Sequence, residues 1–173
     1  MLLSMNIFVT DKHPSKCATC LPDKHIVKMP LECCQMLSIV ASSWYHGYGE
    51  LPRKDGTPYA TKKGAFRNHP CTVWAAESIH NSWWLIQWGI ELCGEYSLRY
   101  NKQHSCYNTL VSAYFMFPQG SIASVTPFVR AMPDRFKHDT SIDTFTAYKW
   151  YIASKPWVRD NYLRMPDRKP SWI

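Results

Sequence analysis

Four polar residues share one line of a predicted helix near the start of the chain. An imidazole, an amine, a carboxylate and an amide stand at i, i+3, i+7 and i+10, as His25, Lys28, Glu32 and Gln35. At about 100° per residue they fall within an arc of about 80°, and nearly all other positions of the segment are apolar. A helix that is apolar on most sides is buried, so these groups must be paired or line a wet cavity. The pattern predicts one wall of an active site, with Glu32, His25 and Lys28 as catalytic residues; the alternative is a buried network that only fixes the packing.

A second polar cluster stands where another helix is expected to begin. In Arg67-Asn68-His69-Pro70, either Asn68 or His69 is placed to cap the helix, with Pro70 in its first turn. The free backbone N–H groups of a helix start attract anions. We therefore expect Arg67, Asn68 and His69 to contact a phosphate or substrate, together with Lys24 at the start of the first helix.

The apolar pattern continues from residue 74 to residue 98. It predicts one long helix, or two helices that meet near Gly89 or Gly94. Three tryptophans in this segment could stack on a nucleic-acid base, but their spacing favours a place in the core. These are Trp83, Trp84 and Trp88.

Further polar residues lie on or after this helical segment. Glu77 and Asn81 stand at i and i+4, which makes Asn81 a second candidate for substrate binding. Glu95 and Arg99 have the same spacing, and the simplest interpretation is an exposed ion pair. Arg130 lies in an irregular apolar stretch that must cross the core or a pocket, so it is also a candidate substrate-binding residue.

Length and composition favour one globular domain over residues 1–173. Aromatic residues make up 14% of the 173 residues and glycine is scarce, which excludes a disordered or repeat protein. We expect a mainly α, compact, single-domain helical bundle with a short N-terminal strand or extended segment and long loops. Residues 1–4 are a possible extension. Residues 42–64 form a basic loop that could close over a phosphate-bearing ligand or simply be solvated. Residues 155–173 form a C-terminal tail that packs on the body of the protein.

The charge balance and the cysteines limit the possible partners and the cellular compartment of the protein. A formal charge of +7 favours a polyanionic partner, either nucleic acid, a nucleotide or an anionic surface. No apolar run reaches the length of a membrane span, and the start of the chain lacks the pattern of a signal peptide. Cysteines placed as buried hydrophobic residues suggest a reducing compartment, so we expect a cytoplasmic protein that does not bind membranes. The oligomeric state cannot be read from the sequence.

We expect neither a cofactor nor a metal ion. Cys17 and Cys20 have the spacing of half a zinc site, but no second CxxC or HxxxH follows. His13 and His25 could complete such a site only if the fold brought them together. Two free thiols are the simpler interpretation.

The order of these motifs resembles that of the phage pyrimidine-dimer DNA glycosylases and similar small viral proteins. Two features carry the likeness: the His-x-x-Lys-x-x-x-Glu-x-x-Gln helix over residues 25–35 and the Arg-Asn-His-Pro entry over residues 67–70. The later Glu-Tyr-x-x-Arg-Tyr at 95–100 is similar to the end of that family's long helix. The chain also resembles phage proteins with Asp-Lys-His-x-x-Lys-Met and Asn-His-Pro-Cys-x-x-Trp motifs.

The resemblance implies an activity and roles for particular residues. In these glycosylases a free N-terminal amine attacks the sugar C1′, and a helix-borne glutamate stabilises the resulting cation and assists the β-elimination that follows. Glu32 matches this glutamate, with Arg67 and His69 as phosphate or substrate contacts. The nucleophile does not transfer directly, because a start at Met5 would expose Asn6 only after processing. Lys24 or Lys28 could instead form a Schiff base if burial or a neighbouring cation lowered its pKa.

These observations lead to one principal hypothesis for function. We expect an enzyme that cleaves an N-glycosidic bond in DNA or in a nucleotide, with Glu32 stabilising positive charge on the sugar. Two alternatives use the same residues. The first is a nucleotide or cyclic-nucleotide phosphodiesterase in which Glu32 or His25 is the base, and the second is a non-enzymatic protein that sequesters a nucleotide.

Overall fold

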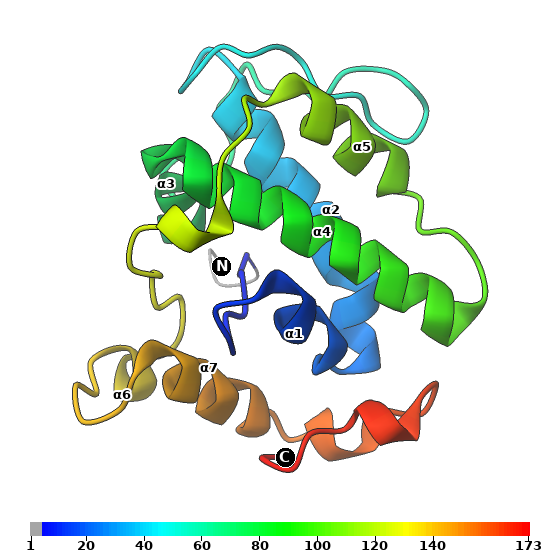
Figure 1. The fold of residues 1–173 in the computed structure, drawn as a ribbon, viewed down its shortest axis with the longest axis vertical. Coiled ribbons are helices and arrows are strands. Elements are labelled where there is room, and N and C mark those ends of the chain that lie inside the picture. The colour runs from blue at the N-terminus through cyan, green and yellow to red at the C-terminus, as the bar shows by residue number, and fades with distance from the viewer. Residues whose placement is uncertain (1–4) are drawn as a thin grey trace.

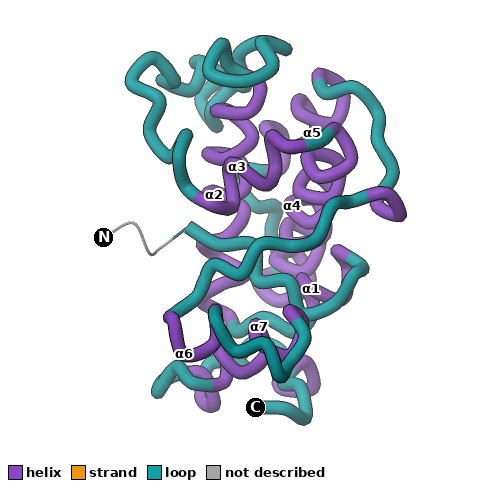
Figure 2. The backbone as a smooth tube through the Cα atoms, turned by 90° about the vertical axis from the view of Figure 1, so that its left-hand side faces the viewer, coloured by secondary structure: helices purple, strands orange, loops and turns teal. Residues whose placement is uncertain are grey.

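The computed structural model describes residues 5–173, so the predicted extension at residues 1–4 lies outside the described residues. Within this range the chain forms helices and loops, and its one isolated β-bridge joins Pro52 to Pro58 (Figure 2). This confirms the predicted mainly α fold. The helices are α1 (Pro14–Thr19), α2 (Asp23–Ala41), α3 (Pro70–Glu77), α4 (Ile79–Tyr100), α5 (Tyr107–Met116), α6 (Asp134–Lys137) and α7 (Thr144–Ala153), with short 3-10 turns η1 (Ile122–Ser124), η2 (Val158–Asp160) and η3 (Pro166–Arg168).

Helices α2 and α4 cross at the centre of the molecule and carry most of the core (Figure 1). Helix α4 is one long helix that runs through both Gly89 and Gly94, so of the two predicted alternatives the meeting of two helices at one of these glycines is wrong. Gly89 instead allows close packing, because a Cβ there would lie 2.5 Å from Leu110 of α5 and 2.8 Å from the Cys33 sulfur of α2. The break falls at Ser78, whose extended backbone and side-chain cap on Asn81 N–H begin α4.

The tryptophans of α4 belong to the core, as their spacing indicates. Trp84 and Trp88 are fully buried and Trp83 is nearly so. Helix α2 continues through Pro30, which lies inside the helix. Helix α1 was not expected from the sequence. Pro14 occupies its first turn, where a missing backbone N–H costs nothing.

The N-terminal segment is the extended alternative of the prediction, and it is buried rather than exposed. Residues 5–10 contain no strand but cross the core face beside α2. The Asn6 side chain holds the turn by accepting hydrogen bonds from the backbone N–H groups of Ile7 and Phe8. Phe8 has a φ of +37°, in the left-handed region that non-glycine residues rarely adopt. Its ring lies on His25 of α2, with a centroid distance of 4.4 Å.

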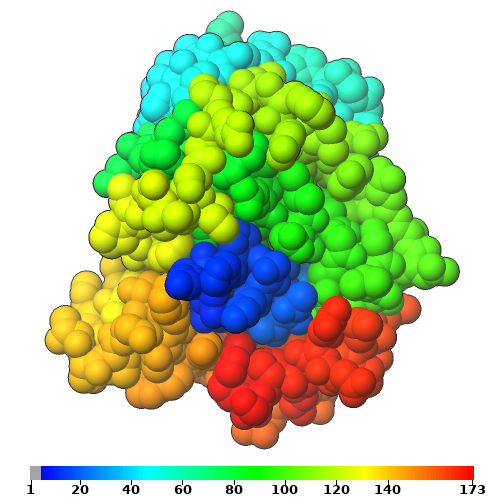
Figure 3. All heavy atoms as spheres, in the orientation of Figure 1, coloured from blue at the N-terminus to red at the C-terminus, as the bar shows by residue number. Residues whose placement is uncertain are grey.

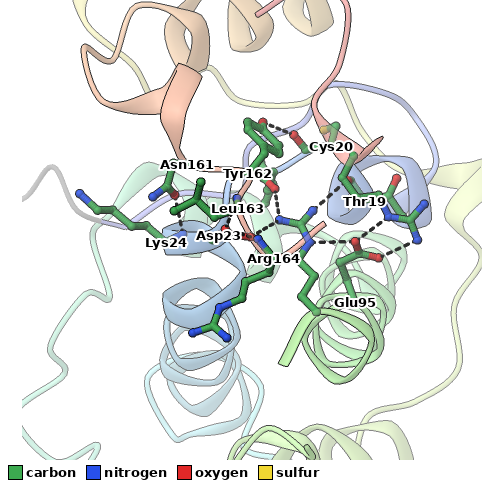
Figure 4. A network of polar contacts seen from close by, with 12 residues as sticks. Thr19, Cys20, Asp23, Lys24, Glu95, Asn161, Tyr162, Leu163 and Arg164 are labelled. Carbon is green, nitrogen blue, oxygen red and sulfur yellow. Dashed lines mark hydrogen bonds and ion pairs between the residues drawn. The ribbon is translucent and has the colours of Figure 1, made fainter. Parts of the chain in front are cut away.

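The start of α2 is joined to the end of α4 by a buried ionic network (Figure 4). Arg99 donates from Nε to Glu95 at 2.9 Å and from Nη1 to Asp23 at 3.1 Å. It also donates to the carbonyl oxygens of Thr19 and Leu21. The prediction of an exposed Glu95–Arg99 pair is therefore wrong, since both residues are buried.

The C-terminal segment packs on this network. Arg168 of η3 donates from Nε to Glu95 at 2.8 Å, and the backbone N–H groups of Leu163 and Arg164 donate to the second Asp23 oxygen. Asn161 accepts from the Lys24 N–H at the first turn of α2. The tail thus caps α2 and is held along its length, and in Figure 3 it lies directly below the N-terminal residues. Across residues 5–173, no helix has the length and apolar character needed to span a membrane.

Candidate functional site

Glu32 is a buried carboxylate with few partners. It is 4% exposed, and its Oε2 lies 3.4 Å from the Lys28 amine one turn earlier on α2. Within residues 5–173 neither of its oxygens accepts a hydrogen bond of regular geometry. Buried carboxylates are normally hydrogen-bonded, so this one has capacity for a further partner.

The surroundings of Glu32 perturb its pKa. Burial raises the pKa of Glu32, and the Lys28 ammonium and the Asn6 backbone N–H offset this only in part. The carboxylate also lies close enough to Cys71, in the first turn of α3, to add to the effect of burial in raising the pKa of that thiol. Three segments therefore meet at Glu32: α2, the start of α3 and the N-terminal segment. A perturbed carboxyl at such a junction is typical of a functional site.

His25 lies one turn before Lys28 and is packed among aromatic rings. It stacks on Phe8 and meets Trp157 edge-on, with centroid distances of 4.4 and 5.4 Å. Burial and the charges of Lys155, Lys28 and Lys24 lower the pKa of His25 to about 3. At neutral pH its imidazole is therefore uncharged, which excludes it as a cationic phosphate ligand. Its Nδ1 is buried and has no hydrogen-bond partner within the described residues.

Glu32 and its neighbours Lys28, Asn6 and Cys71 form the Glu32 cluster. A groove runs along the exposed face of α2, next to this cluster. Its volume is about 1060 Å³, and Lys28 and Gln35 both line it. The Lys28 side chain, 57% exposed, also contacts Glu32, so this residue connects the groove with the buried carboxylate. The predicted polar line thus divides, with Lys28 and Gln35 on the groove and His25 and Glu32 on the buried side.

The walls of the groove are basic and aromatic. The 42–64 loop and the 102–106 segment line it together with α2, and His104 Nε2 hydrogen-bonds the Val27 carbonyl to hold the 102–106 segment in place. One carboxylate, Asp55, lines it and lies 3.9 Å from Arg53. The other cations and rings of the lining are Lys54, Lys102, Tyr59, Phe66 and Tyr96. Such a surface suits a chain of phosphates interleaved with bases.

The predicted helix entry at 67–70 is formed as expected. His69 is the buried N-cap of α3, with Nδ1 accepting from the Cys71 N–H at 3.1 Å, and Pro70 occupies the first turn. The Arg67 guanidinium stacks on Trp44 at 4.4 Å and donates to the backbone of the basic loop. Asn68 is exposed. Through Cys71 this entry lies beside Glu32, whereas Arg67 turns toward the 42–64 loop.

Two other predicted contacts are engaged elsewhere in the fold. The fully buried Asn81 amide donates to the Trp74 carbonyl and to Thr126, and accepts from the Thr126 N–H. Arg130 donates to three backbone carbonyls and to Thr144. Both side chains tie loops to helices, and the structure does not bring them into the Glu32 cluster or the groove.

Several residues at the site were not found from the sequence. Lys155 and Trp157 come from the C-terminal segment and reach the aromatic cluster around His25. Lys102 and His104 come from the turn after α4. Their sequence signal is weak, because a lysine in a tail or turn is usually solvated; a lysine flanked closely by aromatic residues, as at 151–157, is the one cue that the sequence offers.

The described residues contain no group of three or more His, Cys, Asp or Glu side chains that could hold a metal ion. Cys17 is buried and donates to the Asp11 carbonyl at 3.0 Å, and Cys20 lies 3.2 Å from the Thr10 hydroxyl. Burial raises the pKa of Cys17 to about 12, which disfavours the thiolate that zinc requires. All seven cysteines are free thiols.

Comparison with known proteins places these features in a family. No significant match was found among curated proteins or among solved structures. A family model, described as pyrimidine dimer DNA glycosylase, matches residues 5–108. That range covers more than half of the chain and includes α1 to α4, the Glu32 cluster and both walls of the groove. The chain therefore belongs to the pyrimidine dimer DNA glycosylase family.

Proposed function

We propose that this protein binds DNA along the basic groove and cleaves the N-glycosidic bond of a damaged pyrimidine at Glu32. The observation that carries the proposal is the buried Glu32 carboxylate, which has no regular hydrogen bond within residues 5–173 and contacts the groove only through Lys28. Membership of the glycosylase family supports the reaction class.

The charge distribution suits this chemistry. Departure of a base leaves positive charge on the deoxyribose, and a carboxylate in a water-poor site stabilises such charge more strongly than one in bulk water. Lys28 opposes the effect of burial on the pKa of Glu32, so it helps to keep the carboxylate ionised until the sugar cation forms. The partners that the carboxylate lacks in the free protein would then be supplied by the sugar.

The groove supplies affinity rather than chemistry. Lys28, Arg53, Lys54 and Lys102 place cations along it, and phosphates that bind to them would release counterions. Tyr59, Phe66 and Tyr96 offer faces for unstacked bases. We therefore expect tight binding to weaken steeply as salt is raised.

The test compares Glu32→Gln with Glu91→Gln, an exposed position on α4. The probe is an ultraviolet-irradiated DNA duplex that carries a single pyrimidine dimer. We expect Glu32→Gln to lower the rate of glycosidic cleavage by about 100-fold or more, while binding measured by fluorescence anisotropy at fixed salt stays within about threefold. Glu91→Gln should match the wild type.

Three results would contradict the proposal. Retained turnover in Glu32→Gln would remove Glu32 from the chemistry. Cleavage of the phosphate backbone with both glycosidic bonds of the dimer intact would favour a phosphodiesterase. Binding without any product after long incubation would favour a sequestering protein.

A further inference from the structure

A second hollow lies at the start of α2, beside the turn at residues 161–164. Its volume is about 510 Å³, and it is formed by the first turns of α2, by Tyr100 at the end of α4 and by the 161–164 turn. We call it the C-terminal hollow. Val27 and Lys28 line both this hollow and the basic groove. The two depressions are therefore parts of one surface that follows the exposed side of α2.

Three cations line the C-terminal hollow, namely Lys24, Lys28 and Arg164. The Arg164 guanidinium lies over the Tyr100 ring, 4.7 Å from its centre, and this contact holds it at the hollow. Within residues 5–173 neither Lys24 nor Arg164 forms an ion pair with a carboxylate. Both side chains extend away from Asp23 (Figure 4). Their charges are therefore available to an anionic ligand.

Asp23 is the one carboxylate among the described residues that line the C-terminal hollow, and its partners are protein groups. It accepts hydrogen bonds from Arg99 at 3.1 Å and from the backbone N–H groups of Leu163 and Arg164. These bonds offset its negative charge and fix the turn that carries Arg164. The hollow is thus a preformed surface with a net positive charge.

The length of the combined surface indicates a polymer rather than a single nucleotide. Residues 24–39 of α2 lie along it and, at about 1.5 Å per residue, span about 22 Å. A DNA strand advances about 3.4 Å per nucleotide, so this span corresponds to about six to seven base pairs. Both parts of the surface carry cations, with Lys24 and Arg164 at the C-terminal hollow and Arg53 and Lys54 in the groove.

We propose that a DNA duplex lies along α2 and extends beyond the groove into the C-terminal hollow, where Lys24 and Arg164 bind its backbone phosphates. This inference rests on the proposed function for its ligand. It adds a phosphate contact from the 161–164 turn, which lies outside the matched range 5–108. The Arg164 guanidinium donates two parallel hydrogen bonds to one phosphate, and the Lys24 amine acts as a point charge.

The test counts phosphate contacts through the salt dependence of binding. Fluorescence anisotropy gives the association constant of the full-length protein for an undamaged duplex of about 20 base pairs, longer than the proposed contact, at several salt concentrations. The logarithm of this constant falls linearly with the logarithm of the salt concentration, with a slope of about 0.9 for each phosphate bound. We expect Arg164→Gln and Lys24→Gln each to reduce the slope by about 0.9, and the double variant by about 1.8.

Arg135→Gln is the matched control, because Arg135 is exposed on α6 and lines neither the groove nor the C-terminal hollow. It should leave the slope unchanged. A second measurement uses the wild type alone, so it does not depend on how a variant folds. An acetylating reagent labels exposed lysines, and mass spectrometry reads the rate at each one. Bound duplex should slow the labelling of Lys24 by about fivefold or more, while Lys137, exposed on α6, should keep its rate.

An unchanged slope in the double variant, or equal labelling of Lys24 with and without DNA, would overturn the inference. Weaker binding of Arg164→Gln at an unchanged slope would mean that the guanidinium only packs on Tyr100, and would remove its phosphate contact. Binding to phosphatidylserine vesicles that depends on Arg164, with no protection of Lys24 by DNA, would assign the surface to a membrane instead.

These outcomes are separate from those of the proposed function. If a pyrimidine dimer is never cleaved but the slope falls as expected in Arg164→Gln and Lys24→Gln, the proposed glycosidic cleavage fails while this inference stands. If the dimer is cleaved and the slopes do not change, the proposed function stands and the duplex does not reach the C-terminal hollow.

Discussion

Glu95 and Glu32 each have a cation four residues away on the same helix, but the partners around them differ. Each lies on a long helix, each is less than 5% exposed, and each has a cation one helical turn away. Glu95 receives hydrogen bonds from two arginines, Arg99 and Arg168, whereas among residues 5–173 Glu32 has one ion-pair partner, the Lys28 amine at 3.4 Å, and the Asn6 backbone N–H nearby.

The two carboxylates differ in how complete their sets of partners are, which distinguishes a structural ion-pair network from a candidate functional group. Around Glu95 the partners of Arg99 are protein groups that join α1, α2, α4 and the C-terminal segment. Such a network is complete without a ligand. Around Glu32 the partners are few and the cost of desolvation is offset only in part. A protein retains such a cost where a ligand restores the balance.

The largest expected effect comes from breaking the complete network. Arg99→Met should destabilise the protein by about 3–5 kcal/mol, because it leaves Glu95 and Asp23 buried without their shared partner. Urea unfolding followed by circular dichroism measures the free energy of unfolding. Arg159→Met, at an exposed position of the same charge, should change it by less than about 0.5 kcal/mol. A loss below about 1 kcal/mol at Arg99 would show that the network does not stabilise the fold.

The second effect concerns the pH dependence of stability at His25. Its pKa is lowered from 6.5 to about 3 in the folded protein, so between these values the unfolded chain binds more protons. Stability should therefore rise with pH across this window, by at most about 1.4 kcal/mol per pH unit, and be constant above it with respect to this group. His25→Phe keeps an aromatic ring against Phe8 and Trp157 and should remove this contribution.

Unfolding free energies of the wild type and His25→Phe, measured from about pH 4 to about pH 7, give the difference directly. The difference should favour the variant increasingly as pH falls. Parallel curves would mean that the imidazole is solvated or paired, and that the aromatic cluster is more open than the structure indicates.

Sequence reasoning succeeded where the signal is local. The period of apolar residues predicts α2 and the long helical segment of α4, and the proline after His69 predicts the start of α3. The break at Ser78 was missed because glycine is the stronger helix breaker on average, whereas Gly89 serves the close contact between α4 and Leu110. Propensity does not report such packing.

The candidate site was predictable in the parts that α2 and the 67–70 helix entry carry. The i, i+4 spacing of Glu95 and Arg99 is that of an exposed pair, and their burial depends on Asp23 and Arg168, each more than 70 residues away along the chain. The groove and the aromatic cluster around His25 likewise combine segments that are distant in the sequence. One sequence without aligned relatives carries no pairing information between them, so these parts required the fold.

The smallest expected effect has the opposite sign and sharpens the contrast with Arg99. Because the pKa of Glu32 is raised in the folded protein, the folded state binds more protons than the unfolded chain from about its ordinary pKa of 4.5 up to the raised value. The stability of the wild type should fall as pH rises through this window, and the cost persists above it. Glu32→Gln removes the carboxylate, so at pH values above the window it should stabilise the protein, by on the order of 1 kcal/mol or less.

Urea unfolding of Glu32→Gln at neutral pH, beside Glu91→Gln, measures this gain. A gain together with lost glycosidic cleavage would mean that the carboxylate is retained for chemistry at the expense of stability. A loss comparable to that of Arg99→Met would instead place Glu32 in a stabilising pair with Lys28, and the two glutamates would then share one structural role.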